Sequence, residues 1–400
     1  MNGYDFIVVG GGIVGISSAW QLKKKYPEAE ILVIEKENGL GTHQTGHNSG
    51  VIHAGVYYEP GSLKADFCKR GAVWTFEFCH EHGLQTDQCG KLLVATDEFE
   101  LKRMKDLEVR CGKNGIVTER VAEKELHTLE PNIIGFGALL VPATGITNYP
   151  GICNKIAELF LAMGGNIIRG QSVEKIEERS QEISVQLETG KVTAKYLLAC
   201  AGLQADRVAR MAGIKVDFQI VPFRGEYYQL PTTHSNIVKH LIYPIPDPKL
   251  PFLGVHLTKM VDGTVTIGPN AVLGYKREGY GKVNFDFKDV SEMMTFPGFW
   301  KVVRANLKSG VNETIASWFK PGYLKRVQKY CPSLTLQDLQ PYPAGIRAQA
   351  VMQDGKLVHD FLFAESERSL HVCNAPSPAA TSAIPIGEYV CNRLCKKYAL

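Results

Sequence analysis

The chain begins with a glycine-rich turn between an apolar strand and a helix. Residues 4–9 (YDFIVV) form a β-branched and aromatic run, which predicts a buried strand that stops at Gly10. Apolar residues then recur at helical spacing over residues 13–26, and this pattern ends before Pro27, which cannot continue a helix. Residues 30–35 (EILVIE) predict the next buried strand. The start of the chain is therefore constrained to a strand, a tight turn, a helix and a second strand.

This turn carries the pattern Gly10-x-Gly12-x-x-Gly15, which in such a context indicates a dinucleotide site. The first glycine permits the tight turn, the second lets the backbone approach a pyrophosphate, and the third permits close packing of helix on strand. Phosphates then rest on the helix N-terminus, where free N–H groups favour negative charge. Glu35 ends the second strand, where it can accept hydrogen bonds from an adenosine ribose and disfavours a 2′-phosphate. The motif alone does not separate NAD from FAD, and a glycine-rich turn without a ligand is the alternative.

Later segments extend this domain and indicate a second one. Residues 195–202 (KYLLACAG) and 370–375 (LHVCNA) predict strands that return to the same parallel sheet. Residues 216–270 hold strand-like runs divided by prolines and glycines, which predict an antiparallel sheet. We therefore predict an α/β protein with a Rossmann-like dinucleotide domain built from discontinuous segments and an α+β substrate domain. The expected ranges are 1–82, 146–216 and 342–400 for the first domain, and 83–145 and 217–341 for the second.

Composition excludes several classes of protein. A chain of 400 residues is longer than one typical core and suits two domains. Its net charge of +4 is too small to indicate a nucleic-acid partner. Its cysteines are scattered, and the close pair Cys391 and Cys395 lacks companion ligands, so we expect a reducing cytoplasm and no metal site. No stretch approaches the ~20 apolar residues of a membrane span.

Residues 43–58 (HQTGHNSGVIHAGVYY) place three histidines, His43, His47 and His53, among three glycines. Dense histidines suggest a metal site. Interleaved glycines instead suggest a backbone pressed against a flat or charged ligand. Because the stretch follows Glu35 closely, we expect it to cross the middle of an extended dinucleotide.

Segments spread over the whole chain resemble one enzyme family. They are residues 43–58, CGKLLVAT (89–96), PFRGEY (222–227), YPIPDP (243–248), PFLGVH (251–256), GPNAVL (268–273), AGIRAQA (344–350) and NAPSPAATSAI (374–384). Together with the divided dinucleotide domain, they resemble the L-2-hydroxyglutarate oxidase/dehydrogenase family of the FAD-dependent amino-acid oxidase superfamily. The resemblance implies an FAD-dependent oxidoreductase that oxidises L-2-hydroxyglutarate to 2-oxoglutarate by hydride transfer to flavin N5.

The resemblance also implies partners and a location. The substrate would be a small dicarboxylate, and the electrons would pass to a membrane quinone or another acceptor of the electron-transfer chain. We expect a cytoplasmic protein that can contact the inner face of the membrane through the basic segment 301–329, for which a solvated face is the alternative. Two other functions stay open, which are a deaminating flavin-dependent amino-acid oxidase of the same fold and a non-catalytic flavin-binding protein.

The chemistry that the resemblance implies requires a base and cations. Histidine titrates near neutral pH, and His53 and His256 lie in matching segments, so they are the candidate bases; a structural role is the alternative for each. Guanidinium groups hold carboxylates by paired hydrogen bonds, so Arg224 and Arg347 are the candidates for the two carboxylates. A salt bridge or a contact to FAD is the alternative for Arg347. Tyr57 is expected to add a hydrogen bond from its phenol.

The expected cofactor contacts form three groups. The ADP half of FAD would be held by Gly10, Gly12, Gly15 and Glu35. The ribityl chain and flavin would be lined by Thr45, Gly46, Asn48, Ser49 and Gly50. The other side would be closed by Gly202, Ser377, Ala380 and Thr381, near the part of the flavin where negative charge develops on reduction.

Overall fold

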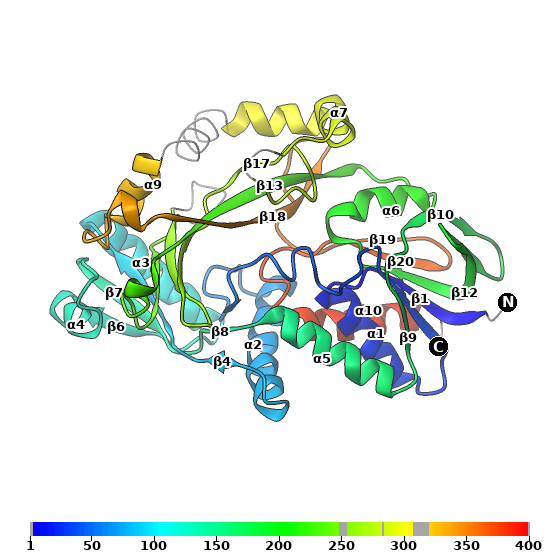
Figure 1. Cartoon of the computed structure of the whole chain (residues 1–400), viewed down its shortest axis with the longest axis horizontal. Helices are drawn as coiled ribbons and strands as arrows, with labels where there is room; N and C mark the ends of the chain where they lie inside the picture. The colour runs from blue at the N-terminus through cyan, green and yellow to red at the C-terminus, as the bar shows by residue number, and fades with distance from the viewer. Residues whose placement is uncertain (1–2, 248–253, 282–283, 307–319, 399–400) are drawn as a thin grey trace.

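The strand, turn and helix expected at the start of the chain form the centre of an eight-stranded sheet. The structure is a computed structural model that describes residues 3–247, 254–281, 284–306 and 320–398 (Figure 1). The strand order is β10 (Val173–Glu178), β11 (Ile183–Leu187), β12 (Gly190–Ala199), β1 (Tyr4–Val9), β2 (Ile31–Ile34) and β9 (Asn166–Ile168). In addition, β20 (Ser369–Asn374) pairs with β12, and β19 (Leu362–Glu365) pairs with β20. The pairs of β1 with β2 and β12, of β2 with β9 and of β12 with β20 are parallel, which confirms the Rossmann-like arrangement.

Both faces of this sheet are buried, which explains why its central strands are continuous apolar runs. Phe6 and Val8 point into one core, and their neighbours Ile7 and Val9 point into another. The first core is covered by α1 (Ile13–Lys25), α5 (Tyr149–Ala162) and α10 (Ala383–Tyr398). The second core packs against apolar side chains of β10, β11 and β12. Helices on one face leave the carboxyl ends of the parallel strands free to meet a ligand.

A second sheet of nine strands is mostly antiparallel, as expected for the substrate domain. Its order is β17 (Val272–Leu273), β13 (Phe218–Gln229), β16 (Val265–Gly268), β15 (His256–Lys259), β14 (Leu241–Pro244), β5 (Lys91–Ala95), β7 (Gly137–Val141) and β6 (Glu119–Ala122). Of its pairings, that of β14 with β5 is parallel. The long strand β18 (Gln340–Met352) pairs with β13 over almost its whole length. The boundary expected at residue 342 thus falls inside a strand of this second sheet.

The remaining elements connect and cover the two sheets. A three-stranded sheet joins β3 (Val51–Ile52), β8 (Gly145–Thr147) and β4 (Thr86–Asp87). The other helices are α2 (Leu63–Glu81), α3 (Glu98–Lys113), α4 (Glu123–Leu129), α6 (Ala205–Met211), α7 (Phe287–Thr295) and α9 (Lys320–Val327). Three short 3-10 turns are η1 (Gly202–Gln204), η2 (Thr232–His234) and η3 (Leu336–Asp338). Within the described part of the chain, no helix has the length and apolar character needed to span a bilayer.

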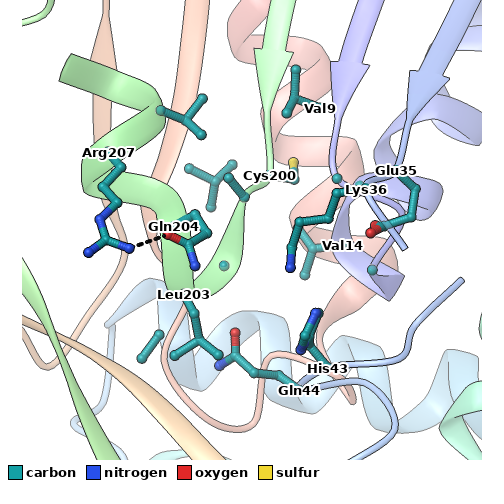
Figure 2. Close-up of a pocket in the computed structure, with 18 of the residues that line it drawn as sticks. Val9, Val14, Glu35, Lys36, His43, Gln44, Cys200, Leu203, Gln204 and Arg207 are labelled. Atoms are coloured by element: carbon teal, nitrogen blue, oxygen red, sulfur yellow. Dashed lines mark hydrogen bonds between the residues drawn. The ribbon is translucent and has the colours of Figure 1, made fainter. Parts of the chain in front are cut away.

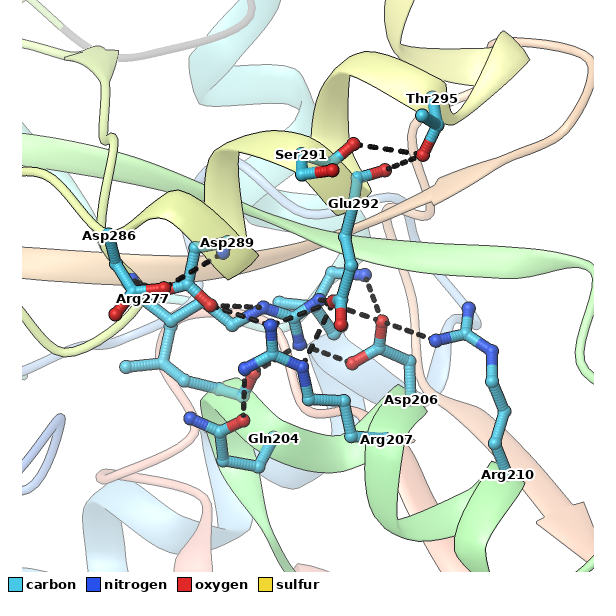
Figure 3. A network of polar contacts seen from close by, with 12 residues as sticks. Gln204, Asp206, Arg207, Arg210, Arg277, Asp286, Asp289, Ser291, Glu292 and Thr295 are labelled. Carbon is cyan, nitrogen blue, oxygen red and sulfur yellow. Dashed lines mark hydrogen bonds and ion pairs between the residues drawn. The ribbon is translucent and has the colours of Figure 1, made fainter.

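A buried ion-pair network joins α6 of the first domain to α7 of the second (Figure 3). Arg277 is 2% exposed and donates to the Asp206 carboxylate and to the Leu203 carbonyl oxygen. Next to it, Arg207 donates to Asp289 at 2.6 Å and to Glu292 at 2.7 Å. Burial alone would raise the pKa of Asp206, but the hydrogen bonds and charge of Arg277 outweigh burial and lower that pKa. The pair of Arg277 with Asp206 therefore depends on Asp206 being ionised, whereas the pairs of Arg207 with Asp289 and Glu292 do not involve it.

Removing one partner of this network should cost more than removing both. We predict that Arg277→Met lowers the free energy of unfolding by about 3–5 kcal/mol, because it leaves the Asp206 charge buried without its main partner. The double variant Arg277→Met, Asp206→Asn should recover most of that loss. Thermal unfolding followed by circular dichroism measures both effects.

The stability lost in Arg277→Met should also depend on pH. The pKa of Asp206 is lower in the folded than in the unfolded state, so its contribution is present above the unfolded value and disappears as pH falls through the folded value. The difference in Tm between the native protein and Arg277→Met should therefore shrink below about pH 4. Equal Tm values at neutral pH would show that this ion pair does not hold the two domains together.

Candidate active site

A cavity of about 710 Å³ opens at the carboxyl ends of β1, β2 and β12 (Figure 2). Gly10, Gly12 and Gly15 line it together with Glu35 and Gly202. The carboxyl ends of parallel strands are where doubly wound sheets bind nucleotides. The cavity thus brings together the residues that were expected to hold the ADP half of FAD.

The backbone of the glycine turn fits a pyrophosphate. Gly10 has a φ of +109°, and a Cβ there would overlap the carbonyl oxygen of Cys200. A Cβ on Gly15 would overlap the carbonyl oxygen of Gly10, so both positions are required by packing. A Cβ on Gly12 would lie 3.6 Å from Thr45 Oγ1, which is an ordinary contact distance. Packing within the protein therefore does not require a glycine here, whereas the close approach of a ligand would. The first turn of α1 carries no acidic residue, so no carboxylate of its own competes with a phosphate for the positive end of the helix dipole.

Glu35 is part of the turn as well as of the cavity wall. It is 8% exposed, and its Oε2 accepts a hydrogen bond from the Gly11 N–H at 2.6 Å. Its Oε1 accepts from the Glu37 N–H at 2.9 Å. Each carboxylate oxygen has a second lone pair, so both oxygens can still accept a ribose hydroxyl.

A second cavity of about 210 Å³ lies between the loop after β2 and the β13/β18 pair. It shares Gln44, Ala379 and Ala380 with the first cavity, so the two are adjacent. Asn48, Ser49, His53 and His256 line it, together with Ser377 and Thr381 from the turn before α10. An extended dinucleotide whose ADP half occupies the first cavity would reach this space with its flavin.

Both candidate bases lie in the wall of the second cavity. Burial lowers the pKa of His53 well below its usual value, and the charges of Lys91, His256, Lys64 and Arg347 lower it further. Burial and the charge of Lys91 lower the pKa of His256 to about 3. His256 Nδ1 lies 3.0 Å from Thr258 Oγ1, and its ring stacks on Tyr243 at 3.8 Å. Both histidines are therefore neutral at pH 7 and can accept a proton.

A third cavity of about 850 Å³ adjoins the second, and both basic and acidic side chains line it. The two cavities share His53, Arg347 and Ser377, and Tyr57 and Lys64 line the third. Burial, followed by the charge of Arg347, lowers the pKa of Lys64 to about 8, so this ammonium stays mainly protonated at pH 7. Two cations next to a neutral histidine suit a substrate that carries two carboxylates.

The structure places the two expected arginines on opposite faces of the β13/β18 pair. Arg347 lies opposite Phe223, and both line the second cavity. Arg224 is the next residue along β13, and successive side chains of a strand point to opposite faces. Arg224 instead donates to Glu226 Oε1 at 2.7 Å and is not among the residues that line the three cavities. The expectation that both arginines reach the substrate thus disagrees with the register of this pair.

Two of the expected flavin-lining glycines are explained by contacts within the protein. A Cβ on Gly46 would lie 2.9 Å from the carbonyl oxygen of Gly41. Gly50 has a φ of +65°, and a Cβ there would lie 2.8 Å from the carbonyl oxygen of Thr147. Neither glycine is among the residues that line the three cavities. Close backbone packing therefore accounts for both positions.

Three polar residues of the expected set hold the site together. Thr45 Oγ1 accepts from the Ile13 N–H at 3.0 Å and so caps α1. Asn48 donates to the carbonyl oxygen of Thr45 at 2.7 Å and accepts from the Gly50 N–H at 2.8 Å. Thr381 Oγ1 lies 2.7 Å from the Tyr149 hydroxyl and accepts from the His53 N–H at 3.3 Å. Through Thr381, the turn before α10 fixes the backbone of His53.

Of the two other histidines of residues 43–58, His43 lines the first cavity and His47 lines the second. His43 Nε2 is 3.0 Å from Glu37 Oε1, and the His47 ring stacks on Tyr280 at 3.6 Å. Ligand atoms of Glu37, His43 and Glu278 lie within 4.8 Å of one another, as in a metal site. However, Lys36 Nζ already donates to Glu37 at 2.8 Å and to Glu278 at 2.6 Å. A lysine of the chain thus already lies between the two carboxylates and offsets part of their charge.

Lys64 is a charged cavity residue that the sequence did not single out. It lies in the first turn of α2, just after the helix cap Ser62, and its ammonium lies 4.5 Å from the centre of the Tyr58 ring. A lysine on an amphipathic helix is most often solvated, so the residue type gives no signal. Only the packing of α2 beside the loop that carries His53 brings Lys64 into the cavity.

Comparisons with known proteins agree with this geometry. The family described as FAD dependent oxidoreductase matches residues 5–393. The L-2-hydroxyglutarate dehydrogenase of Salmonella houtenae is 53% identical, over 98% of this chain and 93% of its own length. The mitochondrial L-2-hydroxyglutarate dehydrogenase of Mus musculus is 43% identical, over 98% and 88%. The FAD-bound L-alpha-glycerophosphate oxidase of Mycoplasma pneumoniae has the same fold, with a TM-score of 0.80 and 21% identity over 99% of this chain and 95% of that chain.

The fold and the glycine cradle define the class of protein, which is an FAD-dependent oxidoreductase. Identities of this size over nearly the full length narrow the class further. The chain belongs to the L-2-hydroxyglutarate dehydrogenase family.

The close contact at Gly15 gives a direct test of the FAD cradle. We predict that Gly15→Ala loses most of its bound FAD, because the added methyl group overlaps the Gly10 carbonyl and shifts the turn. The ratio of flavin absorbance to protein absorbance in the purified variant measures the loss. Gly112→Ala is the matched control, since that glycine lies in α3 with nothing within 4 Å of an added Cβ. Full flavin content in Gly15→Ala would contradict this role of the turn.

Proposed function

We propose that this protein oxidises L-2-hydroxyglutarate to 2-oxoglutarate with FAD as the hydride acceptor. The observation that carries the proposal is the arrangement of a neutral histidine, His53, beside two cations, Arg347 and Lys64, where the second and third cavities meet. Relatives that cover nearly the whole chain are L-2-hydroxyglutarate dehydrogenases, which supports this substrate.

The residues present fit FAD along the first two cavities. Gly10, Gly12, Gly15 and Glu35 would hold the ADP half, and Gly202 would close that cavity. Ser49, Ser377, Ala380 and Thr381 would surround the flavin. When bound, FAD supplies the acceptor for the hydride that leaves the alcohol carbon of the substrate.

In this proposal His53 takes the hydroxyl proton. It lines both the second and the third cavity, whereas His256 lines only the second of these two, so His53 is better placed between cofactor and substrate. Burial, followed by the charges of the surrounding cations, lowers the pKa of His53 and keeps it neutral in the free enzyme. A bound dianion would offset those cations and raise the pKa of His53 as the reaction begins. His256, whose Nδ1 is engaged with Thr258, would orient the ligand as a neutral hydrogen-bonding group.

Arg347 and Lys64 would each bind one carboxylate of the substrate. Tyr57 would add a hydrogen bond, because its buried hydroxyl has no hydrogen-bond partner among the described residues. Burial raises the pKa of this phenol well above its usual value, so it remains a donor. Such a site would bind 2-hydroxy acids that lack the second carboxylate more weakly, because one charge-assisted contact with the substrate would be lost.

We further propose that a quinone at a membrane surface takes the electrons. Phe287 is 80% exposed at the start of α7, and Phe285 and Trp300 lie near it in sequence and are also exposed. Lys288 and Lys301 place positive charge beside these side chains, as suits an anionic membrane. Part of the basic segment expected to contact lipid, residues 307–319, lies outside the described residues. Sedimentation with anionic vesicles and reoxidation by a soluble quinone test this step separately from substrate oxidation.

Flavin absorbance tests the proposed reaction directly. Anaerobic holoprotein would be mixed with L-2-hydroxyglutarate, its D enantiomer or L-glutamate, and the flavin absorbance band at about 450 nm would be followed. We predict loss of this band with the L-hydroxy acid alone. Bleaching by L-glutamate with release of ammonia would instead indicate an amino-acid oxidase. A flavin that none of the compounds bleaches would favour a binding protein and would contradict the proposal.

The two faces of the β13/β18 pair predict unequal effects of two arginines. Arg347→Met should raise KM for L-2-hydroxyglutarate by about 100-fold or more, since it removes a charged partner of a substrate carboxylate. The control is Arg224→Met combined with Glu226→Gln, which removes the ion pair on the other face without leaving a buried charge. Its KM should stay within about threefold of the native value. A larger rise in KM for the control than for Arg347→Met would refute this assignment.

A further inference from the structure

Lys91 is a buried cation that the proposed reaction does not use. It is the first residue of β5 and is 0% exposed. Its ammonium has no hydrogen-bond partner among the described residues. Burying an unpaired lysine lowers the stability of the folded protein, because burial penalises the charged form. The position therefore calls for a functional explanation.

The surroundings of Lys91 are aromatic rings and thiols. Its Nζ lies 5.0 Å from the centre of the Tyr57 ring and 5.1 Å from that of Tyr243, distances at which a cation is attracted to the ring. Cys68 of α2 and Cys111 of α3 are the titratable groups that act on its pKa. Burial raises the pKa of both thiols, so neither supplies a negative charge at pH 7. Burial lowers the pKa of Lys91 itself to about 8, which leaves it mainly protonated at neutral pH.

The sheet places this charge directly behind the candidate bases. Leu241 of β14 pairs with Lys91, and Tyr243 lies two residues further along the same strand, so Lys91 and Tyr243 share a face. The Tyr243 ring stacks on His256, with ring centres 3.8 Å apart and planes 8° apart. The Tyr57 ring connects Lys91 to the loop that carries His53. The Tyr243 ring thus lies between the ammonium and His256, and Tyr57, which contacts the ammonium, belongs to the same loop as His53.

We propose that Lys91 is a positioning residue whose buried charge keeps His53 and His256 neutral and thereby sets the acidic limit of catalysis. Besides Lys91 of β5, the titratable or charged groups that face His53 are His256 of β15, Lys64 and Cys68 of α2, and Arg347 of β18. Lys64 and Arg347 are expected to be paired with substrate carboxylates. Lys91 is shielded from solvent and lies outside the residues that line the second and third cavities, so its charge persists throughout the cycle. This inference rests on the proposed role of His53.

Replacing Lys91 by methionine, an apolar side chain of similar length, tests the effect of its charge. In Lys91→Met, the acidic limb of the pH profile of kcat/KM should move up by about one pH unit, because a protonated imidazole is no longer repelled. The sign follows from the charge, since losing a nearby cation raises the pKa of a base and inactivates it at higher pH. Lys91→Arg should keep the native limb. The surface variant Lys356→Met is the matched control, because it removes one positive charge from a side chain that is 82% exposed.

A second measurement does not depend on turnover. Histidine side chains would be titrated by NMR in the isotope-labelled holoprotein, with the His53 signal identified from its absence in His53→Asn. We expect the pKa of His53 to rise in Lys91→Met by the same amount as the kinetic limb. The Tm should be unchanged or higher, since an unpaired buried charge has been removed. Should Lys91→Met fail to fold, Lys91→Gln offers the same loss of charge with a polar side chain.

The two measurements separate failure of this inference from failure of the proposed function. If the pKa of His53 is the same in Lys91→Met as in the native protein, the proposed role of Lys91 is wrong, whatever the substrate is. An enzyme that L-2-hydroxyglutarate does not reduce, but whose His53 titration shifts on loss of Lys91, would refute the proposed substrate and retain the electrostatic role. A fall in Tm with no shift in the titration would show that Lys91 is only structural.

Discussion

The antiparallel pairing of β13 with β18 decides which side chains can meet the cofactor and the substrate. Phe223, Gly225 and Tyr227 of β13 line the second cavity, and Arg347 of β18 joins them from across the pair. Residues between them point to the other face, where Arg224 is held by Glu226. A slip of one residue in this pairing would exchange the two sets. The register of one strand pair thus selects the cation that faces the site.

Three cations of the chain act together on His53. Arg347, Lys64 and Lys91 all act on His53, and all three lower its pKa. Such an arrangement costs stability in the free protein, because like charges repel and burial penalises each of them. A substrate with two carboxylates would relieve that repulsion, whereas a neutral analogue of the same shape would not. In the proposed mechanism, the cations that would bind the substrate would therefore also control when His53 is able to accept a proton.

The sequence was informative wherever the signal was local. The run of residues 4–9 and the helical pattern from residue 13 correspond to β1 and α1, because apolar spacing, glycine and proline act within a few residues. Comparable local signals located β2, the end of β12 and β20. The two sheet types followed from composition and spacing in the same way. Contacts between distant segments carried no such signal.

The candidate site depends mainly on such distant contacts. Gly50 is required by the approach of Thr147, nearly a hundred positions later in the chain, and not by the ligand that its neighbours suggested. The face of Arg224 was fixed by its pairing with Ile346, which the order of residues does not reveal. Lys64 and Lys91 are ordinary residues in sequence and become functional candidates only through burial and neighbours. Sequence alone therefore predicted the cofactor cradle better than the substrate pocket.

The most direct test of this account is a crystal structure of the protein with FAD and 2-oxoglutarate bound. The account predicts a flavin ring in the cavity lined by Ser49, His256 and Ala380, and the diacid beside His53 with its carboxylates on Arg347 and Lys64. Lys91 should lie behind the histidines without touching either ligand. A diacid bound to Arg224, or a flavin outside the cavity beside the β13/β18 pair, would contradict it.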